Sequence, residues 1–374
     1  MLTFSTAGES HGRGVFAFLD GLPAGLRVDR ALIDEDLARR QKGYGRGGRM
    51  AIEQDEVDVL SGIRGGVTLG SPILLAVWNR DFENWKDFMD PWRIEPGREL
   101  HTPRPGHADL AGAARFGHTD LRNVLERSSA RETAGRVAAG GLLRSFLKAL
   151  GIEVFSWVTR IGGAVWEGPF DWAARDASSV FCPDQAATRA MEQEIDRVVE
   201  SGDSIGGEFK AVLSGLPAGI GSCTQWDARL DTIVSAHLMS IPGIKAVQIG
   251  LGVECGTLPG SQVHDAILPG TPLRRGSNNA GGIEGGISNG EPLVVRCTMK
   301  PIPTLKEGLA TIDIRDGSPA RASYERSDHC AVPAASVVGE AMLIIAVSAA
   351  ILSSFGLPSM DALAEAFSRQ RGAL

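Results

Sequence analysis

Five basic side chains stand among four glycines in the segment RRQKGYGRGGRM, residues 39–50. Their positions are Arg39, Arg40, Lys42, Arg46 and Arg49. Like charges at this density repel one another unless an anion lies between them. Guanidinium groups bind phosphate or carboxylate oxygens in pairs, and glycines let backbone N–H groups approach the same anion. The segment therefore predicts an anion-binding loop; a solvated basic surface or an RGG-type nucleic-acid segment is the alternative.

A second candidate is the segment HTPRPGHADL, residues 101–110, in which prolines constrain the loop that carries Arg104 and His107. Histidine is the side chain that most readily exchanges a proton near neutral pH, so it can serve as a general acid or base. For a single loop histidine, a surface position without a chemical role is the alternative.

The third candidate is SSARETAGR, residues 128–136, which opens a predicted helix. Hydroxyl groups and backbone N–H groups at a helix N-terminus suit an anion, and Arg131 adds positive charge. A capping role for Ser128 or Ser129 explains the serines equally well.

The overall charge directs attention to these local clusters. The chain of 374 residues carries a net charge of −7, with the apolar and charged fractions of an ordinary globular protein. Bulk electrostatics therefore do not attract a polyanion, and any anion must be captured by a local basic cluster. The arginine-rich segment is a single short cluster with one aromatic side chain, Tyr44, and not a series of interleaved aromatic residues, which weakens the nucleic-acid alternative. We expect neither nucleic acid nor a membrane as a partner.

Cysteine usage and the apolar segments favour a cytoplasmic protein. The five cysteines include no C-x-x-C pair, so we expect free thiols and no metal site. The first residues lack the pattern of a secretory signal. The apolar stretch 337–355 contains Glu340 and several serines, and predicts a buried core helix rather than a membrane span. No P-loop, nucleophile elbow or H-E-x-x-H motif is present.

Three pairs of segments recur in the same order along the chain. ESHGRGVFAFLDGLPAG aligns without a gap on DSIGGEFKAVLSGLPAG, and both end in GLPAG. The three pairs are residues 9–25 with 203–219, 62–77 with 282–297, and 126–141 with 325–340. We interpret them as an internal duplication within one domain, with approximate halves 1–190 and 191–374. Chance resemblance between glycine-rich turns is the alternative.

Each repeat predicts a strand, a turn and a helix. VFAFL and EFKAVL are apolar runs of strand length that end in GLPAG turns. The stretches VDRALIDEDLARRQ and WDARLDTIVSAHLMS predict helices, with Asp29 and Asp227 near their starts as caps. PILLAV and PLVVRCTM predict further strands. We expect an α+β fold of two pseudo-symmetric halves, each an antiparallel sheet with helices on one face.

Matched positions that differ in type indicate where the halves have specialised. The differing pairs are His11 with Ile205, Ser129 with Asp328, and Arg131 with Cys330. Polar groups that converge from both halves would suit a site at the interface between them.

Together these residues resemble the chorismate synthase family. The motifs that carry the resemblance are GESHG, RRQKGYGRGGRM, RPGHAD, RSSARETAGRVAAG, GDSIGG, MSIPGIKAVQIG, NNAGGIEGGISNGEP, MKPIPTL and RSDHCAVPAASVVGEAM. They run in family order from the first residues to about Met342. The departures are Phe16 and Phe18, which are bulkier than the usual aliphatic residues, and Gly243 in place of a typical alanine.

The resemblance implies a lyase of the shikimate pathway of aromatic amino-acid biosynthesis. Its reaction would be the anti-1,4-elimination of phosphate from 5-enolpyruvylshikimate 3-phosphate to give chorismate, with reduced FMN required but not consumed. The family fold is a β-α-β sandwich with internal pseudosymmetry, usually assembled as a homotetramer. Members with an added reductase activity bind NADPH near Arg40 and Arg46, whereas chains of bacterial length usually depend on an external reductant such as a separate flavin reductase. The resemblance leaves that choice open.

The resemblance also implies roles for individual residues. Catalysis would fall to His11 and His107 as acids, one near the substrate phosphate and one protonating reduced flavin, with Asp328 assisting proton movement at flavin N5. The implied substrate-binding residues are Arg40, Arg46, Arg49, Arg104, Ser129, Arg131 and Arg326. The implied FMN-binding residues are Arg127, Ser128, Ser129, Gly285, Lys300, Pro301, Ile302, Pro303, Thr304 and Arg326.

Two other classes of function stay open on the sequence. A flavoprotein reductase would consume NADPH steadily without a shikimate-type substrate. A non-catalytic protein that binds anions or RNA through the arginine-rich segment would show salt-dependent RNA affinity.

Overall fold

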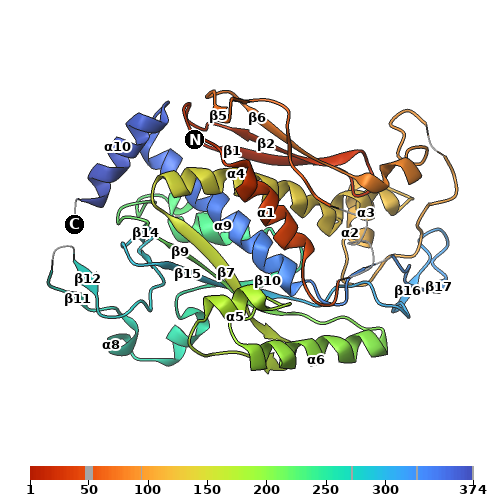
Figure 1. Cartoon of the computed structure of the whole chain (residues 1–374). Helices are drawn as coiled ribbons and strands as arrows, with labels where there is room; N and C mark the ends of the chain where they lie inside the picture. The colour runs from red at the N-terminus through yellow and green to blue at the C-terminus, as the bar shows by residue number, and fades with distance from the viewer. Residues whose placement is uncertain (47–53, 94, 271–272, 326, 373–374) are drawn as a thin grey trace.

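The computed structural model describes residues 1–46, 54–93, 95–270, 273–325 and 327–372. Two antiparallel sheets enclose a layer of helices between them (Figure 1). The four-stranded sheet has the order β1 (Thr3–Gly8), β2 (Gly14–Asp20), β6 (Ile73–Trp78) and β3 (Asp58–Val59). The five-stranded sheet has the order β10 (Ile244–Ile249), β15 (Leu293–Met299), β9 (Gly207–Ser214), β7 (Glu153–Ile161) and β8 (Ala164–Val165). This arrangement confirms the expected α+β sandwich.

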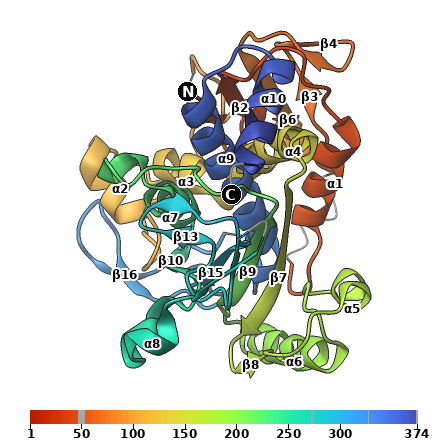
Figure 2. The same ribbon diagram turned by 90° about the vertical axis from the view of Figure 1, so that its left-hand side faces the viewer.

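Four helices form the middle layer, seen from a second direction in Figure 2. They are α1 (Arg30–Gln41), α4 (Thr133–Ala149), α7 (Leu230–Met239) and α9 (Val332–Phe355). The most extensive helix contact joins α4 to α9, while α4 packs on the first sheet and α9 on the second. The two sheets therefore share one core through this pair of helices.

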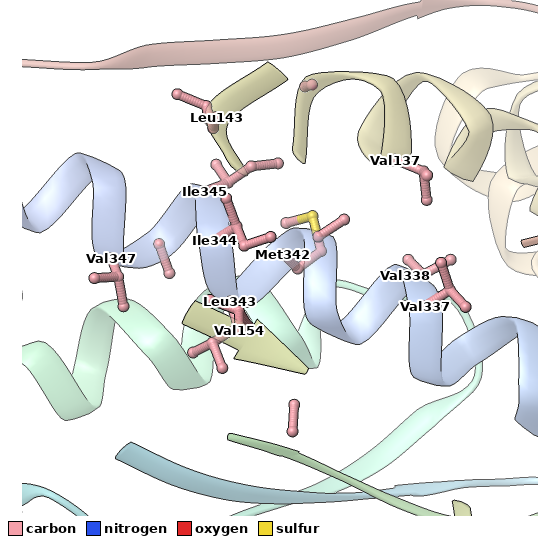
Figure 3. Packing of buried hydrophobic residues seen from close by; sticks show 14 of the residues in the cluster. Val137, Leu143, Val154, Val337, Val338, Met342, Leu343, Ile344, Ile345 and Val347 are labelled. Carbon is pink, nitrogen blue, oxygen red and sulfur yellow. The ribbon is translucent and has the colours of Figure 1, made fainter. Parts of the chain in front are cut away.

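Helix α9 is apolar on all sides because every side of it is covered. Of its most apolar 18-residue stretch, 94% is buried inside the protein, which confirms the expected core helix. Figure 3 shows Val337, Leu343 and Ile345 of this helix among side chains such as Val137 of α4. The helix is long and apolar enough to span a membrane, but here its side chains fill the interior of the sandwich.

Local sequence signals explain where the elements begin and which of their residues are buried. Strand β9 alternates strictly between buried and half-buried residues, as its period-two pattern predicts. The side chain of Asp29 accepts a hydrogen bond from the backbone N–H of Ala31 and caps α1, as expected. Asp227 does not cap α7: it lies inside a short 3-10 helix, and α7 begins three residues later at Leu230 without a side-chain cap.

The remaining elements are short or peripheral. The helices are α2 (Asp109–Phe116), α3 (Arg122–Ser128), α5 (Trp172–Ala177), α6 (Gln185–Ser201), α8 (Gly260–Val263) and α10 (Met360–Arg371). The short strands are β4 (Ile63–Arg64), β5 (Val67–Thr68), β11 (Ile267–Leu268), β12 (Arg274–Arg275), β13 (Ile283–Glu284), β14 (Ile287–Ser288), β16 (Ala310–Ile312) and β17 (Pro319–Arg321). All five cysteines are free.

The repeated segments occupy matching places in the two halves. β2 pairs with β6 as β9 pairs with β15, and α4 begins at Thr133 as α9 begins at Val332. A buried hydroxyl holds each GLPAG turn in the same way. Thr68 donates to the carbonyl of Pro23 at 2.7 Å, and Ser288 donates to that of Pro217 at 2.6 Å. These matches support the predicted duplication.

Sheet membership divides the chain earlier than residue 190. β7 begins at Glu153 and pairs with β9, so the strand belongs to the second sheet. The expected boundary near residue 190 lies within α6, which follows β7 along the chain. The sequence pairs begin only at residue 203 in the second half, and they therefore gave no signal for β7.

Candidate active site

His11 lies in the turn between β1 and β2, where Glu126 of α3 holds it from two sides. Its Nδ1 is 2.8 Å from Glu126 Oε1, and its backbone N–H donates to Oε2 at 2.8 Å. Burial alone would raise the pKa of Glu126, but the hydrogen bonds from His11 and the charges of His11 and Arg122 lower it. Because an ionised carboxylate only accepts hydrogen bonds, Nδ1 carries the proton in this pair.

An indole covers the histidine ring. Trp85 stacks on His11 with ring centroids 3.8 Å apart, and the guanidinium of Arg98 lies 3.8 Å from the Trp85 ring centroid. Arg122 is 3.3 Å from Glu126 and 3.1 Å from Glu325 of the second half. The imidazole is therefore fixed in orientation and only 8% exposed.

Arg40 and Arg131 share one buried carboxylate. Arg40 donates to Asp55 Oδ2 at 2.9 Å, and Arg131 donates to Oδ1 at 2.6 Å. Burial lowers the pKa of Arg40, Asp55 raises it, and the positive charges of Arg131 and Arg46 lower it further. Burial would raise the pKa of Asp55, but the two guanidinium groups outweigh it and the pKa falls. Two buried guanidinium groups thus lie on one carboxylate, and guanidinium groups are the donors that bind phosphate or carboxylate oxygens in pairs.

Arg46 joins the two halves. Its guanidinium forms an ion pair of 2.8 Å with Asp328, which precedes α9 in the second half. The expectation that polar groups from both halves converge is met here. Arg49 and Arg326 lie outside the described residues.

His107 belongs to another polar group, at the start of α2. Its Nδ1 lies 2.5 Å from Asp109 Oδ1, and Arg104 donates to Asp109 Oδ2 at 2.8 Å. Burial would raise the pKa of Asp109, but hydrogen bonds from His107 and Arg104 hold it well below its usual range. Arg104 also donates to Thr304 at 3.0 Å, and Lys300 donates to the carbonyl of Gly106. The histidine loop therefore packs against the segment 300–304 of the second half.

The expected flavin-binding residues occupy three places. Arg127 donates to the backbone carbonyls of Thr6 and Gly8, at 2.9 and 3.1 Å, close to the His11 turn. Ser128 donates to the carbonyl of Val124 at 2.8 Å. Ser129 caps the 3-10 helix before α4, accepting from the N–H of Arg131 at 3.3 Å, and it accepts from Ser10 at 3.0 Å. The capping alternative for Ser129 is thus realised.

The other two places are in the second half. In the run of Lys300, Pro301, Ile302, Pro303 and Thr304, the carbonyl of Ile302 accepts from Ser204 at 2.6 Å. Gly285 lies in the β13–β14 turn with a φ of +60°, and its carbonyl accepts from Arg229 at 3.2 Å. The contacts of Gly285 thus lie with the start of α7 and not with either histidine group.

A cavity of about 1170 Å³ lies away from these groups, between the β7–β8 turn, α5 and the start of α6. Its lining contains none of the expected site residues. The candidate site therefore rests on its charged groups and not on this cavity.

Five residues of the site were not predicted from the sequence: Asp55, Asn79, Trp85, Asp109 and Glu126. Asp109 lies two residues after His107, and Glu126 directly precedes the segment 127–129. Their closeness in sequence to predicted site residues was the signal that could have identified them. The other three meet His11 and Arg131 only through tertiary folding.

Comparison with known proteins places the chain in a family. The family model described as Chorismate synthase matches residues 2–352. The chain is 53% identical over 372 residues to the chorismate synthase of Desulforudis audaxviator, with 97% of this chain and 95% of the relative covered. It is 50% identical over 376 residues to that of Trichlorobacter lovleyi, with 96% of each covered. A solved structure described as "Crystal Structure of Chorismate Synthase" matches with a TM-score of 0.79 and 39% identity, covering 98% of this chain and 96% of that one. The chain therefore belongs to the chorismate synthase family and is an enzyme of the lyase class.

Proposed function

We propose that the protein converts 5-enolpyruvylshikimate 3-phosphate to chorismate by anti-1,4-elimination of phosphate, with reduced FMN as cofactor. The observation that carries the proposal is the buried pair Arg40 and Arg131 on one carboxylate, Asp55. A substrate with a phosphate and two carboxylates supplies the negative charge that this cluster favours. Membership of the chorismate synthase family supports this choice of substrate and product.

The arginines would stabilise the departing phosphate. Negative charge accumulates on the leaving group as the C–O bond breaks, so guanidinium groups that are already in place lower the barrier. Arg40 and Arg131 are both held by Asp55, and Arg46 by Asp328, so little reorganisation is needed. The complete substrate-binding set proposed is Arg40, Arg46, Arg49, Arg104, Ser129, Arg131 and Arg326.

The residues proposed for FMN have the donor chemistry that a phosphate-bearing flavin needs. They supply a guanidinium group from Arg127, hydroxyl groups from Ser128, Ser129 and Thr304, and an ammonium group from Lys300. Burial lowers the pKa of Lys300, and the charge of Lys245 lowers it further. An adjacent anion would act in the opposite direction and favour the charged ammonium group. Bound reduced FMN would supply the electronic assistance for C–O bond cleavage.

The two histidines would hold the protons. In each, a carboxylate accepts from Nδ1, Glu126 for His11 and Asp109 for His107. Such a pairing fixes the orientation of the ring, as a proton donor facing phosphate or flavin requires. Asp328, paired with Arg46, would assist proton movement.

An anaerobic assay tests the proposal. Purified protein is mixed with chemically reduced FMN and 5-enolpyruvylshikimate 3-phosphate, and chorismate and free phosphate are followed together. Equimolar release of both, abolished when FMN is omitted or oxidised, is the expected result. Folded protein that binds flavin but releases neither product would refute the proposal.

The setting proposed for this activity is a cytoplasmic homotetramer that depends on an external reductant. NADPH oxidation by the purified protein, measured with FMN and without any added reductase, would contradict the last point. Sedimentation equilibrium measures the assembly.

A further inference from the structure

One buried amide holds the loop that carries His11. Asn79 follows the last residue of β6 and is 5% exposed. Its Nδ2 donates to the carbonyls of Glu9 at 3.2 Å, Ser10 at 3.2 Å and Gly12 at 2.7 Å. An amide NH₂ has only two protons, so the three carbonyls share them, and the chain on both sides of His11 curves around a single donor.

The other end of the same amide binds the site arginine. Asn79 Oδ1 accepts from Arg131 Nε at 2.7 Å. Carbonyls only accept and a guanidinium only donates, so the network fixes which way the amide points. Asparagine alone among side chains of this length offers both a donor pair and an acceptor. The position of His11 is thereby coupled to that of Arg131.

The second half has no such amide at the matched position. The alignment that pairs residue 62 with 282 pairs Asn79 with Met299, a half-buried residue at the end of β15. The counterparts of His11 and Arg131 are Ile205 and Cys330, which meet in an isolated parallel β-bridge. The amide, the imidazole and the guanidinium group of the first half therefore correspond to a thioether, an aliphatic side chain and a thiol. The buried amide thus occurs in the half that also carries the candidate histidine and arginine.

We propose that Asn79 is a positioning residue that holds His11 and Arg131 in one relative geometry for the elimination reaction. The inference rests on the proposed function. Asn79 is buried and its hydrogen bonds go to the His11 turn and to Arg131, so it would act through these two groups. Displacement of about 1 Å at a reacting centre can reduce turnover by about 100-fold.

The test compares Asn79→Ala with Thr68→Ala in the holoenzyme. Thr68 is a matched control because its buried hydroxyl also holds a turn, donating to Pro23 and accepting from the N–H of Leu26, away from both histidines. Asn79→Ala is expected to lower kcat about 10- to 100-fold, while FMN binding is kept. Thr68→Ala is expected to lose a similar amount of thermal stability with kcat within about twofold of wild type. If Asn79→Ala retains wild-type kcat, or if Thr68→Ala loses the same activity, the proposal is overturned.

Histidine-selective NMR separates this inference from the proposed function. The His11 signal, assigned by its loss in His11→Ala, is expected to shift in Asn79→Ala and to stay unchanged in Thr68→Ala. An unshifted His11 signal would overturn the positioning role even where kcat falls. If the wild-type protein forms no chorismate, the proposed function fails, while the NMR comparison still decides whether Asn79 orders the His11 turn. Should Asn79→Ala not fold, Asn79→Ser is used, which keeps one hydroxyl and is expected to show the same changes at smaller size.

Discussion

Arg39 and Arg40 are neighbours in the last turn of α1, yet they enter two different buried clusters. Successive residues of a helix point about 100° apart, so one arginine faces the core and the other faces the site. Arg39 donates to both oxygens of Glu340 at 3.0 Å and to Asp36 at 2.9 Å. Arg40 donates to Asp55 at 2.9 Å. The same residue type thus has two environments within one turn of helix.

The partners of the arginines separate these clusters. The core cluster combines Arg39 and Arg144 with Asp36 and Glu340, and Ser156 donates to Glu340 at 2.8 Å. Arg40 and Arg131 instead both contact Asp55, within the part of the chain that the structure describes.

The pKa values of Arg39 and Arg40 shift in opposite directions. Burial lowers the pKa of Arg39, but Glu340 and Asp36 more than reverse the effect, so its pKa is raised. Burial lowers the pKa of Arg40, and Asp55 does not restore it against the charges of Arg131 and Arg46. We expect the cluster of Arg39 to stabilise the fold and the cluster of Arg40 to bind a ligand. Substitutions in the two clusters should therefore change different measurements.

The largest expected effect is on turnover at the site. His11→Ala should leave folding intact, because the matched position of the other half holds Ile205 without an ionisable group. Turnover should fall by about 10² to 10⁴-fold, the usual contribution of a general acid. Chorismate formation and circular dichroism measure the two quantities. A folded variant with full activity would remove His11 from the mechanism.

The next effect is on stability in the core cluster. Glu340→Ala leaves Arg39 and Arg144 buried without their common partner, and should lower the free energy of unfolding by about 3–5 kcal/mol. Urea denaturation measures it. Glu340→Gln, which keeps the shape, is the control for volume and should also destabilise because the charge is lost. A change below about 1 kcal/mol would show that the cluster is not stabilising.

The neighbouring arginines provide the sharpest contrast. Arg40→Met should raise KM for the substrate by about 10- to 100-fold, since a charged hydrogen bond contributes about 1.5–3 kcal/mol. Its stability should change little because Asp55 keeps Arg131 as partner. Arg39→Met should lower the free energy of unfolding and leave KM for the substrate unchanged. If both variants change the same quantity, the distinction between the clusters is wrong.

The smallest effect concerns acid stability. The folded-state pKa of Asp55 lies below its ordinary value of 3.8, so its contribution is present above that pH and is lost as pH falls through the folded-state value. Unfolding free energy should therefore decline below about pH 3.8, with Glu340 adding to the decline below its ordinary 4.5. Asp55→Asn should show a shallower decline over this range in urea titrations at successive pH values. An unchanged slope would exclude Asp55 from the acid response.

The sequence by itself determined several strands and helices, the repeated segments and the family. Period-two runs gave β2 and β9, and the apolar stretch gave α9, because these signals lie in neighbouring residues. The motifs around His11, His107 and Arg131 gave the candidate chemistry for the same reason.

Tertiary structure decided which group each charged side chain meets. No spacing within the arginine-rich segment says that Arg39 reaches Glu340, 301 residues away, while Arg40 reaches Asp55. Asn79 likewise meets the His11 turn across 67 to 70 residues. Packing of α1 against α4 and α9 sets these partners, and burial then fixes the strength of each ion pair. Local pattern supplies the residues, and only the packed fold distinguishes an arginine in the core cluster from one in the candidate site.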